Sequence, residues 1–206
     1  MTSEWRIMGL VSAVRHLSRK EIPSEHVECE VWCGVSATAM AQTLIHEGGP
    51  EHSIWLHDTF EGMTAPTWAD VDHSGKEASA TFDERLRGAD YSGGCYSPLE
   101  EVQSNMRRIN LAEERVHFIK GDVSCALRTR TPESTRLLPL NPDWFESSRD
   151  ELKVLYPHLS PLGVCIVDDD GHWEGARKAV DEYFDEIYPR SLRARLDYTG
   201  RMWVKA

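Results

Sequence analysis

Three things are scarce in this 206-residue sequence: positive charge, paired cysteines and long apolar runs. It has 23 lysines and arginines against 34 aspartates and glutamates, which gives a formal net charge of −11 at pH 7. Such an excess of acid argues against a basic groove for nucleic acid and against attraction to an anionic membrane. No run approaches the roughly 18 apolar residues of a membrane-spanning helix. We therefore expect neither nucleic acid nor a membrane as a partner.

The cysteines and histidines are too scattered to form a site of their own. There are five cysteines, an odd number, and no two of them form a Cys-x-x-Cys pair. A disulfide framework or a structural zinc site is therefore not expected. The nine histidines lack metal-ligand spacing. The first residues also lack the basic and apolar regions of a signal peptide, so the expected compartment is the cytoplasm.

What the sequence does contain is an alternation of short apolar runs with amphipathic stretches of helix length. The pattern predicts strands at 26–32, 53–57, 116–119, 136–140 and 163–167, and helices at 8–20, 36–47, 98–109, 145–156 and 173–187. Two short apolar runs follow, around 192–196 and 202–204. This order is typical of βα units in a doubly wound, mostly parallel α/β sheet. The length suits one domain, residues 1–206.

Residues 62–94 interrupt this alternation. They are rich in Gly, Ser, Thr, Asp and Ala and show no sustained period, which predicts a loop without regular structure. A loop of this length in a compact domain is usually functional, so we expect residues 62–95 to cover the substrate as a lid. The alternative is a disordered surface insertion. Its aromatic residues Trp68, Tyr91 and Tyr96 either pack against a ring-containing substrate or form a small cluster of their own.

Acidic residues follow the predicted strands, where an open parallel sheet binds its ligands. Asp58 ends the second strand, and an acid there can accept both hydroxyl groups of a ribose. Asp122 follows the third strand and can accept the amino group of an adenine. Carboxylates at such positions also cap the next helix. Their joint occurrence in chain order nevertheless favours a nucleoside-type ligand.

A second acidic group follows the fourth and fifth strands, with Asp143 after one and Asp168, Asp169 and Asp170 after the other. Because these strands are neighbours in a doubly wound sheet, the carboxylates would lie side by side and repel one another. Either some of them bind protons or a divalent cation neutralises them. Oxygen ligands alone suit Mg²⁺ or Mn²⁺. The alternative is a set of exposed helix caps.

Several motifs resemble those of the macrocin O-methyltransferase family, whose members methylate hydroxyl groups of sugars and related natural products with S-adenosylmethionine and Mg²⁺. The resemblance runs from about Ile22 to the C-terminus, and the string Asp-Thr-Phe-Glu-Gly-Met at 58–63 is rather specific. Other matching segments are Val27-Glu28-Cys29, Asp143-Trp144-Phe145-Glu146-Ser147, Leu155-Tyr156-Pro157, Val167-Asp168-Asp169, Gly171-His172-Trp173-Glu174-Gly175-Ala176 and Asp197-Tyr198-Thr199-Gly200. The resemblance implies a class I methyltransferase-like (Rossmann-like) sheet of seven strands with an antiparallel C-terminal strand.

The resemblance also implies a role for individual residues. Asp143 would be the general base that takes the proton of the acceptor hydroxyl, and His172 would help to place the acceptor. The partner would be a small-molecule acceptor, and a homodimer is implied because relatives often form oligomers. Cofactor-binding residues would be Glu28, Glu30, Gly34, Asp58, Thr59, Phe60 and Asp122, and magnesium ligands would be Asn141, Asp168 and Asp169.

Three residues depart from the family pattern. Glu30 stands in place of a glycine, at a turn where backbone approaches the cofactor closely. It would either clash with the methionine carboxylate or pair with the ammonium group. Asn141 replaces the first aspartate of an Asp-x-Asp motif, so the affinity for a metal should fall. Asp170 replaces a tyrosine and would add negative charge beside the acceptor.

The leading hypothesis is an S-adenosylmethionine-dependent, Mg²⁺-assisted O-methyltransferase of secondary metabolism, such as antibiotic biosynthesis. Its acceptor would be a hydroxyl group of a small natural product. The departures leave two alternatives open. One is a repurposed enzyme that catalyses a cyclisation, isomerisation or elimination, with Glu30 and Asp170 as acid/base groups. The other is a non-catalytic subunit.

Overall fold

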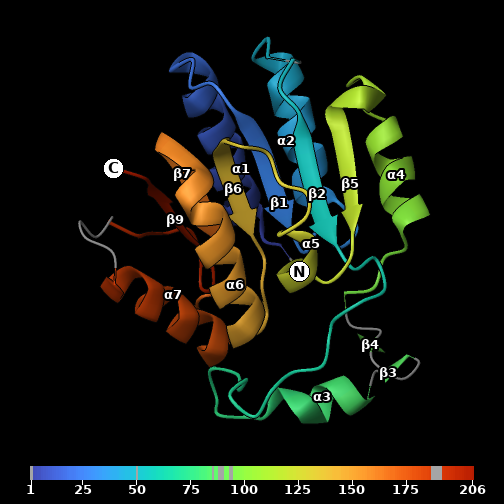
Figure 1. Cartoon of the computed structure of the whole chain (residues 1–206), viewed down its shortest axis with the longest axis vertical. Coiled ribbons are helices and arrows are strands. Elements are labelled where there is room, and N and C mark those ends of the chain that lie inside the picture. Colours follow the sequence, from blue (N-terminus) through green and yellow to red (C-terminus); the bar gives the residue numbers. More distant parts are fainter. Residues whose placement is uncertain (1, 50, 85, 88–90, 93–94, 187–191) are drawn as a thin grey trace.

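A seven-stranded sheet forms the centre of the molecule (Figure 1). The computed structural model describes residues 2–49, 51–84, 86–87, 91–92, 95–186 and 192–206. The strand order is β5-β2-β1-β6-β7-β9-β8. The strands are β1 (Glu25–Cys29), β2 (Ile54–Asp58), β5 (Val116–Lys120), β6 (Thr135–Leu140), β7 (Leu159–Val167), β8 (Ala194–Arg195) and β9 (Arg201–Val204).

The strand directions confirm the predicted fold class. Strands β5, β2, β1, β6 and β7 pair in parallel. Strand β9 pairs antiparallel with β7, and β8 pairs antiparallel with β9. The C-terminal part of the sheet is therefore a two-stranded hairpin, one strand more than the single antiparallel strand expected. Strand β1 is shorter than predicted because Glu30 and Trp32 have positive φ angles of 59° and 50°, which turn the chain away from the sheet.

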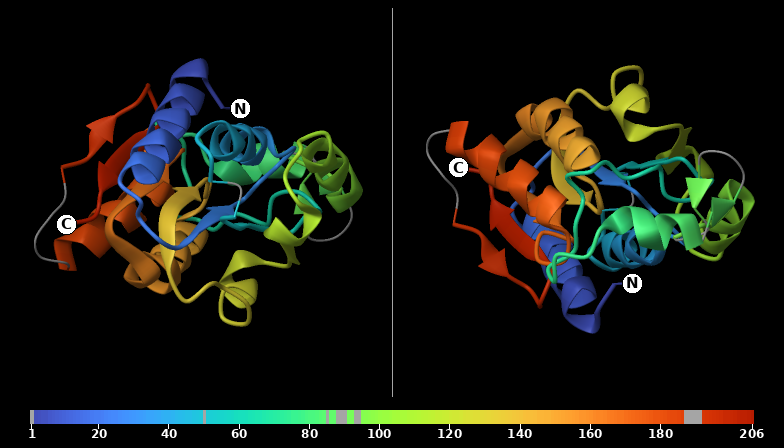
Figure 2. Two further views of the ribbon diagram at one scale, coloured as in Figure 1. Left: turned by 90° about the horizontal axis from the view of Figure 1, so that it is seen from above. Right: turned by 90° about the horizontal axis from the view of Figure 1, so that it is seen from below.

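Helices cover both faces of the sheet, as the two end views show (Figure 2). Helices α1, α2 and α4 lie on one face, and α5, α6 and α7 lie on the other. The predicted helices are confirmed with small shifts in their ends, as α1 (Glu4–Arg19), α2 (Val35–His46), α4 (Leu99–Arg107), α6 (Phe145–Leu155) and α7 (Glu174–Glu186). The structure adds the short helix α5 (Val123–Ala126), which was not predicted, and 3-10 turns at Glu113–Arg115 and Tyr156–His158. Of α7, the predicted last residue Ile187 lies outside the described residues.

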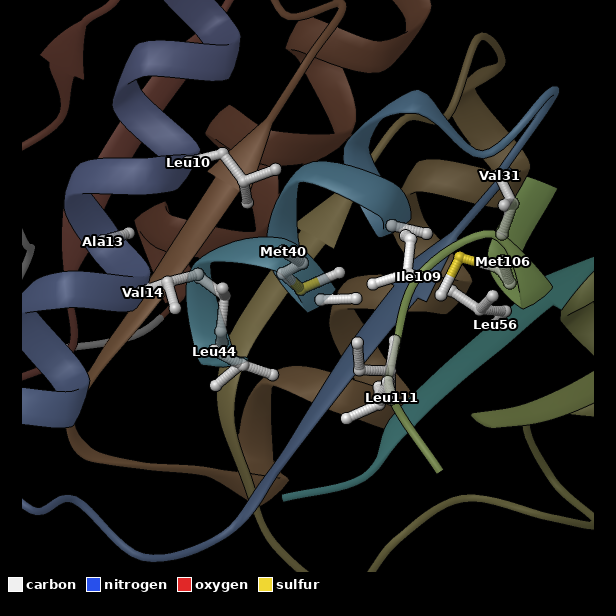
Figure 3. Close-up of a cluster of buried hydrophobic side chains, with 14 of the residues drawn as sticks. Leu10, Ala13, Val14, Val31, Met40, Leu44, Leu56, Met106, Ile109 and Leu111 are labelled. Carbon is white, nitrogen blue, oxygen red and sulfur yellow. The ribbon is translucent and has the colours of Figure 1, made fainter. Parts of the chain in front are cut away.

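Two apolar cores hold these layers together. On the first face, Leu10 and Val14 of α1 pack with Met40 and Leu44 of α2 over the sheet (Figure 3). Helix α1 begins at Glu4, four residues earlier than predicted, because the side chain of Ser3 accepts a hydrogen bond from the Arg6 amide and caps the helix. The second core lies under α6 and α7 and contains Leu138, Leu152, Leu155, Val180 and Phe184.

The segment after β2 has more regular structure than the sequence indicated. The prediction of an unstructured loop at 62–94 is wrong, because this segment contains α3 (Ala78–Glu84) and the antiparallel pair β3 (Leu86–Arg87) and β4 (Tyr91–Ser92). These elements are too short to produce a readable period. In Figure 1 the arrowheads of β1 and β2 point toward this segment.

One aromatic residue of this segment does not belong to the cluster that was one of the two expectations, because Trp68 is 93% exposed. Tyr96 is 39% exposed. The side chain of Tyr91 lies outside the described residues. Across the described ranges, no helix combines the length and the apolar character needed to cross a membrane. All five cysteines are free thiols.

Candidate active site

One pocket lies at the carboxyl ends of the parallel strands, between those ends and the segment that contains α3. The loops after β1, β2, β5, β6 and β7 all contribute to its wall, because parallel strands bring their carboxyl ends to one edge of the sheet. Met63, Ala78 and Phe82 close it from the α3 side. Of the residues predicted for the site, the pocket wall contains Glu28, Glu30, Asp58, Thr59, Asp122, Asn141, Asp143, Asp168, Asp169 and His172.

Gly34 and Phe60 were also predicted to bind the cofactor, but they lie outside this wall. Gly34 has a φ of 80° and caps α2, and its amide donates to the Val31 carbonyl at 3.0 Å. The Phe60 side chain is buried and packs near Phe118, with 6.4 Å between ring centroids. Both residues shape the loops that carry the pocket.

Backbone amides hold the acid at the end of β2. The Trp32 amide donates to Asp58 Oδ2 at 3.0 Å, and the Phe60 amide donates to Oδ1 at 2.6 Å. Burial raises the pKa of Asp58, and these hydrogen bonds oppose the rise. Asp122 is held in the same way, since it caps α5 by accepting from the Ser124 amide at 2.9 Å. These carboxylates are therefore fixed by backbone close to them in space.

Asn141 joins the carboxyl ends of β1 and β6. Its amide nitrogen donates to the carbonyl oxygens of Cys29 at 3.2 Å and Glu30 at 3.1 Å, and lies 3.5 Å from Glu28 Oε1. Glu28 is fully buried, and its second carboxylate oxygen has no hydrogen-bond partner among the described residues. Burial, and then the charge of Asp168, raise the pKa of Glu28 well above its usual value. A cationic group of a bound ligand would therefore be stabilised at this end of the pocket, next to Glu28.

Glu30 of the pocket wall is partly buried, and Glu151 of α6 lies close enough to interact with it. Glu30 is in the left-handed region, which costs a residue with a side chain about 1–2 kcal/mol. Burial, and then the charge of Glu151, raise its pKa well above the usual value. Glu151 of α6 is fully buried, and within the described part of the chain both its carboxylate oxygens lack a hydrogen bond. Sequence reasoning missed Glu151, although its place beside Leu152 on the inner side of α6 was a usable signal.

Asp143 lies after β6 beside two tryptophans. Trp173 Nε1 donates to Asp143 Oδ1 at 2.8 Å, and Trp173 packs edge-on against Trp144 with 5.0 Å between centroids. Burial, and then the charge of Asp169, raise the pKa of Asp143 to about 8. His172 Nδ1 is 2.7 Å from the hydroxyl of Tyr198. The tryptophans were not assigned a role from the sequence, although both stand inside the family motifs.

Asp168 is paired with a residue that sequence reasoning did not connect to the site. Arg6 of α1 forms an ion pair with Asp168 and a second one with Asp197 at 3.1 Å. Burial, and then Asp169, raise the pKa of Asp168 to about 7, while Arg6 lowers it. No local pattern could have found Arg6, because it stands in an ordinary amphipathic helix at the other end of the sequence.

Asp170 does not face the acceptor region as expected. It is 4% exposed and absent from the pocket wall. Arg201 of β9 lies 3.2 Å from it, and Arg193 lies 3.9 Å away. The expectation of added charge beside the acceptor is wrong, because the chain turns after β7 and directs this side chain toward the C-terminal hairpin. Asp170 is also not available as the acid/base group that one alternative required.

The side chains predicted to hold magnesium are engaged in other contacts. Asp168 is occupied by Arg6, and Asn141 directs its amide nitrogen, not its oxygen, into a ring of acceptors. In the ranges that the structure describes, no group of three or more His, Cys, Asp or Glu side chains is placed to hold a metal ion. The predicted magnesium ligands Asn141, Asp168 and Asp169 therefore do not fit a metal site as arranged.

Comparison with known proteins shows the family to which this chain belongs. The sequence matches the family described as Macrocin-O-methyltransferase (TylF) over residues 1–205. It is 29% identical over 198 residues to an 8-demethyl-8-(2,3-dimethoxy-alpha-L-rhamnosyl)-tetracenomycin-C 4'-O-methyltransferase of Streptomyces olivaceus, covering 96% of this chain and 72% of that protein. It is 27% identical over 203 residues to the mycinamicin III 3''-O-methyltransferase of Micromonospora griseorubida, covering 98% of this chain and 76% of that protein.

Solved structures give the same result. The O-methyltransferase NovP superposes with a TM-score of 0.83 at 25% identity, covering 98% of this chain and 79% of that one. An O-methyltransferase from Bacillus cereus in complex with SAH superposes with a TM-score of 0.63 at 15% identity, covering 100% and 83%, which shows the shared fold. The chain thus belongs to the macrocin O-methyltransferase family and is an enzyme of the O-methyltransferase class.

Proposed function

We propose that this enzyme transfers a methyl group from S-adenosylmethionine to a hydroxyl group of a small natural product, as a step in antibiotic biosynthesis. The observation that carries the proposal is one continuous pocket with Asp58 and Asp143 in its wall. In this proposal Asp58 binds the cofactor, and Asp143 is the general base. Relatives named above act on rhamnosyl-tetracenomycin and mycinamicin compounds, and a solved relative carries SAH. A sugar-bearing acceptor is therefore the first class to test.

The cofactor would lie across the ends of β2, β1 and β5. Asp58 accepts the ribose hydroxyls and Asp122 accepts the adenine amino group, because both line the pocket and follow the neighbouring strands β2 and β5. Glu28 faces the cationic end, where its unpartnered buried oxygen can accept from the ammonium group. The described pocket wall contains no lysine or arginine, so its field favours the positively charged sulfonium cofactor over anions.

Asp143 is the general base in this proposal. The acceptor oxygen attacks the methyl carbon, the carbon–sulfur bond breaks, and its electron pair stays on sulfur to give S-adenosylhomocysteine. The acceptor proton passes to Asp143. Because Trp173 holds one carboxylate oxygen at 2.8 Å, the other is the one that faces the acceptor. Most of the rate comes from holding oxygen, methyl and sulfur in line. No step is routed through a metal ion.

The segment 62–95 is part of the same proposal, as the cover over the acceptor. It is anchored to the start of α6, because the Trp144 indole donates to the Thr64 carbonyl at 2.9 Å. The Phe145 amide donates to Asp70 Oδ1 at 2.8 Å. Met63 and Phe82 face the pocket from this segment. These anchors support a cover over the acceptor half of the pocket, next to Asp143, and not over the adenine end.

The test is an incubation of the purified enzyme with S-adenosylmethionine and a panel of sugar-bearing natural products that carry free hydroxyls. We expect S-adenosylhomocysteine and an acceptor heavier by one methyl group in equal amounts. The acids Glu30 and Glu151, whose pKa values are raised well above the usual value, favour a second candidate, a repurposed enzyme that converts its substrate without methylation. Turnover without S-adenosylhomocysteine would support that candidate. Calorimetry that detects no binding of S-adenosylmethionine would exclude the main proposal.

A further inference from the structure

We propose that Arg6 is the built-in counter-cation of the acceptor site, so that this enzyme works without the divalent ion its family resemblance implies. The inference rests on the proposed function, because the acceptor site is defined by methyl transfer. Its test measures metal binding and does not require methyl transfer. Arg6 is absent from the pocket wall, so it acts through Asp168 as a positioning residue.

The first argument is the position of the guanidinium group. Arg6 is 8% exposed, and it lies between Asp168 at the end of β7 and Asp197 in the loop before β9. Asp168 and Asp169 are adjacent carboxylates in the pocket wall, and Arg6 is paired with the first of them. A buried guanidinium supplies positive charge next to these carboxylates, which is the electrostatic role that a divalent ion would otherwise have.

The second argument is that the fold holds Arg6 in place. Ser3 and the amides of Thr199 and Gly200, the last at 2.7 Å, all donate to Asp197, so this acid is rigid. The Arg6 side chain lies against Gly200, where an added Cβ would come within 2.9 Å of Arg6 Cδ. Gly200 therefore leaves the space in which the Arg6 side chain lies, and a larger residue at 200 would crowd that side chain.

The third argument concerns Asn141. Its amide nitrogen faces two backbone carbonyl oxygens and approaches Glu28. An aspartate at this position would place a carboxylate against those oxygens and would be repelled. Asn141 therefore suits a site without a metal ion, where its amide group links β1 to β6. An aspartate would suit a site in which a cation lies between the oxygen atoms. Asn141 and the Arg6–Asp168 ion pair thus both favour a site without a metal ion.

A divalent ion at Asp168 would compete directly with Arg6. Both are cations and both need the same carboxylate, so binding of the ion requires the buried guanidinium to leave. We therefore expect removal of Arg6, together with restoration of the acid at 141, to create metal affinity that the natural protein lacks. Arg6→Lys keeps the charge and should retain the natural behaviour.

The experiment is a titration with Mn²⁺ followed by electron paramagnetic resonance, with competition by Mg²⁺. It compares the unaltered protein, R6K, the double variant R6A/N141D, and R15A as a matched control. Arg15 lies on the same helix, but it is largely exposed and pairs with Glu47. We expect only R6A/N141D to bind Mn²⁺, at least about 10-fold more tightly than the others. Thermal melting checks that each variant is folded.

Two results would overturn the inference. One is tight Mn²⁺ binding by the unaltered protein that Asp168→Asn abolishes. The other is a folded R6A/N141D variant that binds Mn²⁺ no better than the unaltered protein. If the double variant does not fold, the titrations of the unaltered protein and R6K decide. Since these titrations need no acceptor, a failure of methyl transfer leaves their outcome readable. Where methyl transfer is observed, we expect EDTA to change its rate less than about 2-fold.

Discussion

The two halves of the pocket control their carboxylates by different means. In the cofactor half, made by the loops after β1, β2 and β5, backbone amides hold Asp58 and Asp122. In the acceptor half, made by the loops after β6 and β7, side chains from other elements hold Asp143 and Asp168. A carboxylate held by local backbone keeps its position through many substitutions. One held by distant side chains depends on the packing of the whole domain.

The largest expected effect is in the acceptor half. Replacing Asp143 by Asn keeps an oxygen for Trp173 but removes the base, so kcat should fall by about 10²–10⁴-fold. Binding of S-adenosylmethionine should be unchanged by calorimetry, since Asp143 lies away from the adenosine end. A D143N enzyme with more than about a tenth of the natural rate would contradict the assignment of the base.

In the cofactor half, Asp58→Ala should weaken binding of S-adenosylmethionine by about 10- to 100-fold. This is the expected loss when charge-assisted hydrogen bonds worth about 1.5–3 kcal/mol are removed. Calorimetry measures it directly. The matched control is Glu61→Ala, because Glu61 is a nearby acid that pairs with Lys120 and is absent from the pocket wall. Equal losses in the two variants would show that Asp58 acts through net charge alone.

A smaller effect concerns stability and pH. Burial, and then Asp143, raise the pKa of Glu151 well above its unfolded value. The folded state then binds more protons than the unfolded state between those two values, so stability falls as the pH rises through this interval. Glu151→Gln should therefore melt a few degrees higher than the natural protein at pH 8, with the difference shrinking toward pH 5.

The control for this prediction is Glu146→Gln, an exposed acid in the first turn of the same helix. It should leave the melting curve unchanged at both pH values. Parallel pH–stability curves for the natural protein and E151Q would show that burial of Glu151 does not cost folding energy.

The smallest expected effect is at Glu30. Glycine tolerates the positive φ of 59°, so Glu30→Gly should raise the free energy of unfolding by about 1 kcal/mol. Glu30→Gln removes the charge but keeps the strained backbone, which makes it the matched control. At a pH above the raised pKa of Glu30, the binding of S-adenosylmethionine should also tighten a few-fold in both variants, because one negative charge leaves the region of the methionine carboxylate. Chemical denaturation that finds E30G less stable than E30Q would contradict the backbone argument.

The same contrast explains what the sequence could predict. The parallel sheet and the acid at the end of β2 follow from short-range patterns, namely apolar runs and a carboxylate directly after a strand. The partners of Asp168, the direction of Asp170 and the burial of Glu151 depend on how elements far apart in the chain pack together. No local pattern in the sequence predicts the ion pair of Arg6 with Asp168. None predicts the ion pair of Arg201 with Asp170, which lies outside the pocket wall.

The ion pairs of Arg6 also set an order of events during synthesis. Helix α1 leaves the ribosome well before Asp197 and β9, which stand at the other end of the domain. Until then, neither the hairpin that receives Arg6 nor its second carboxylate exists. A nascent chain halted just before Asp197 would hold most of its sheet but would lack the second partner of Arg6. Synthesis of the C-terminal hairpin thus completes the ion pairs that lie behind Asp168.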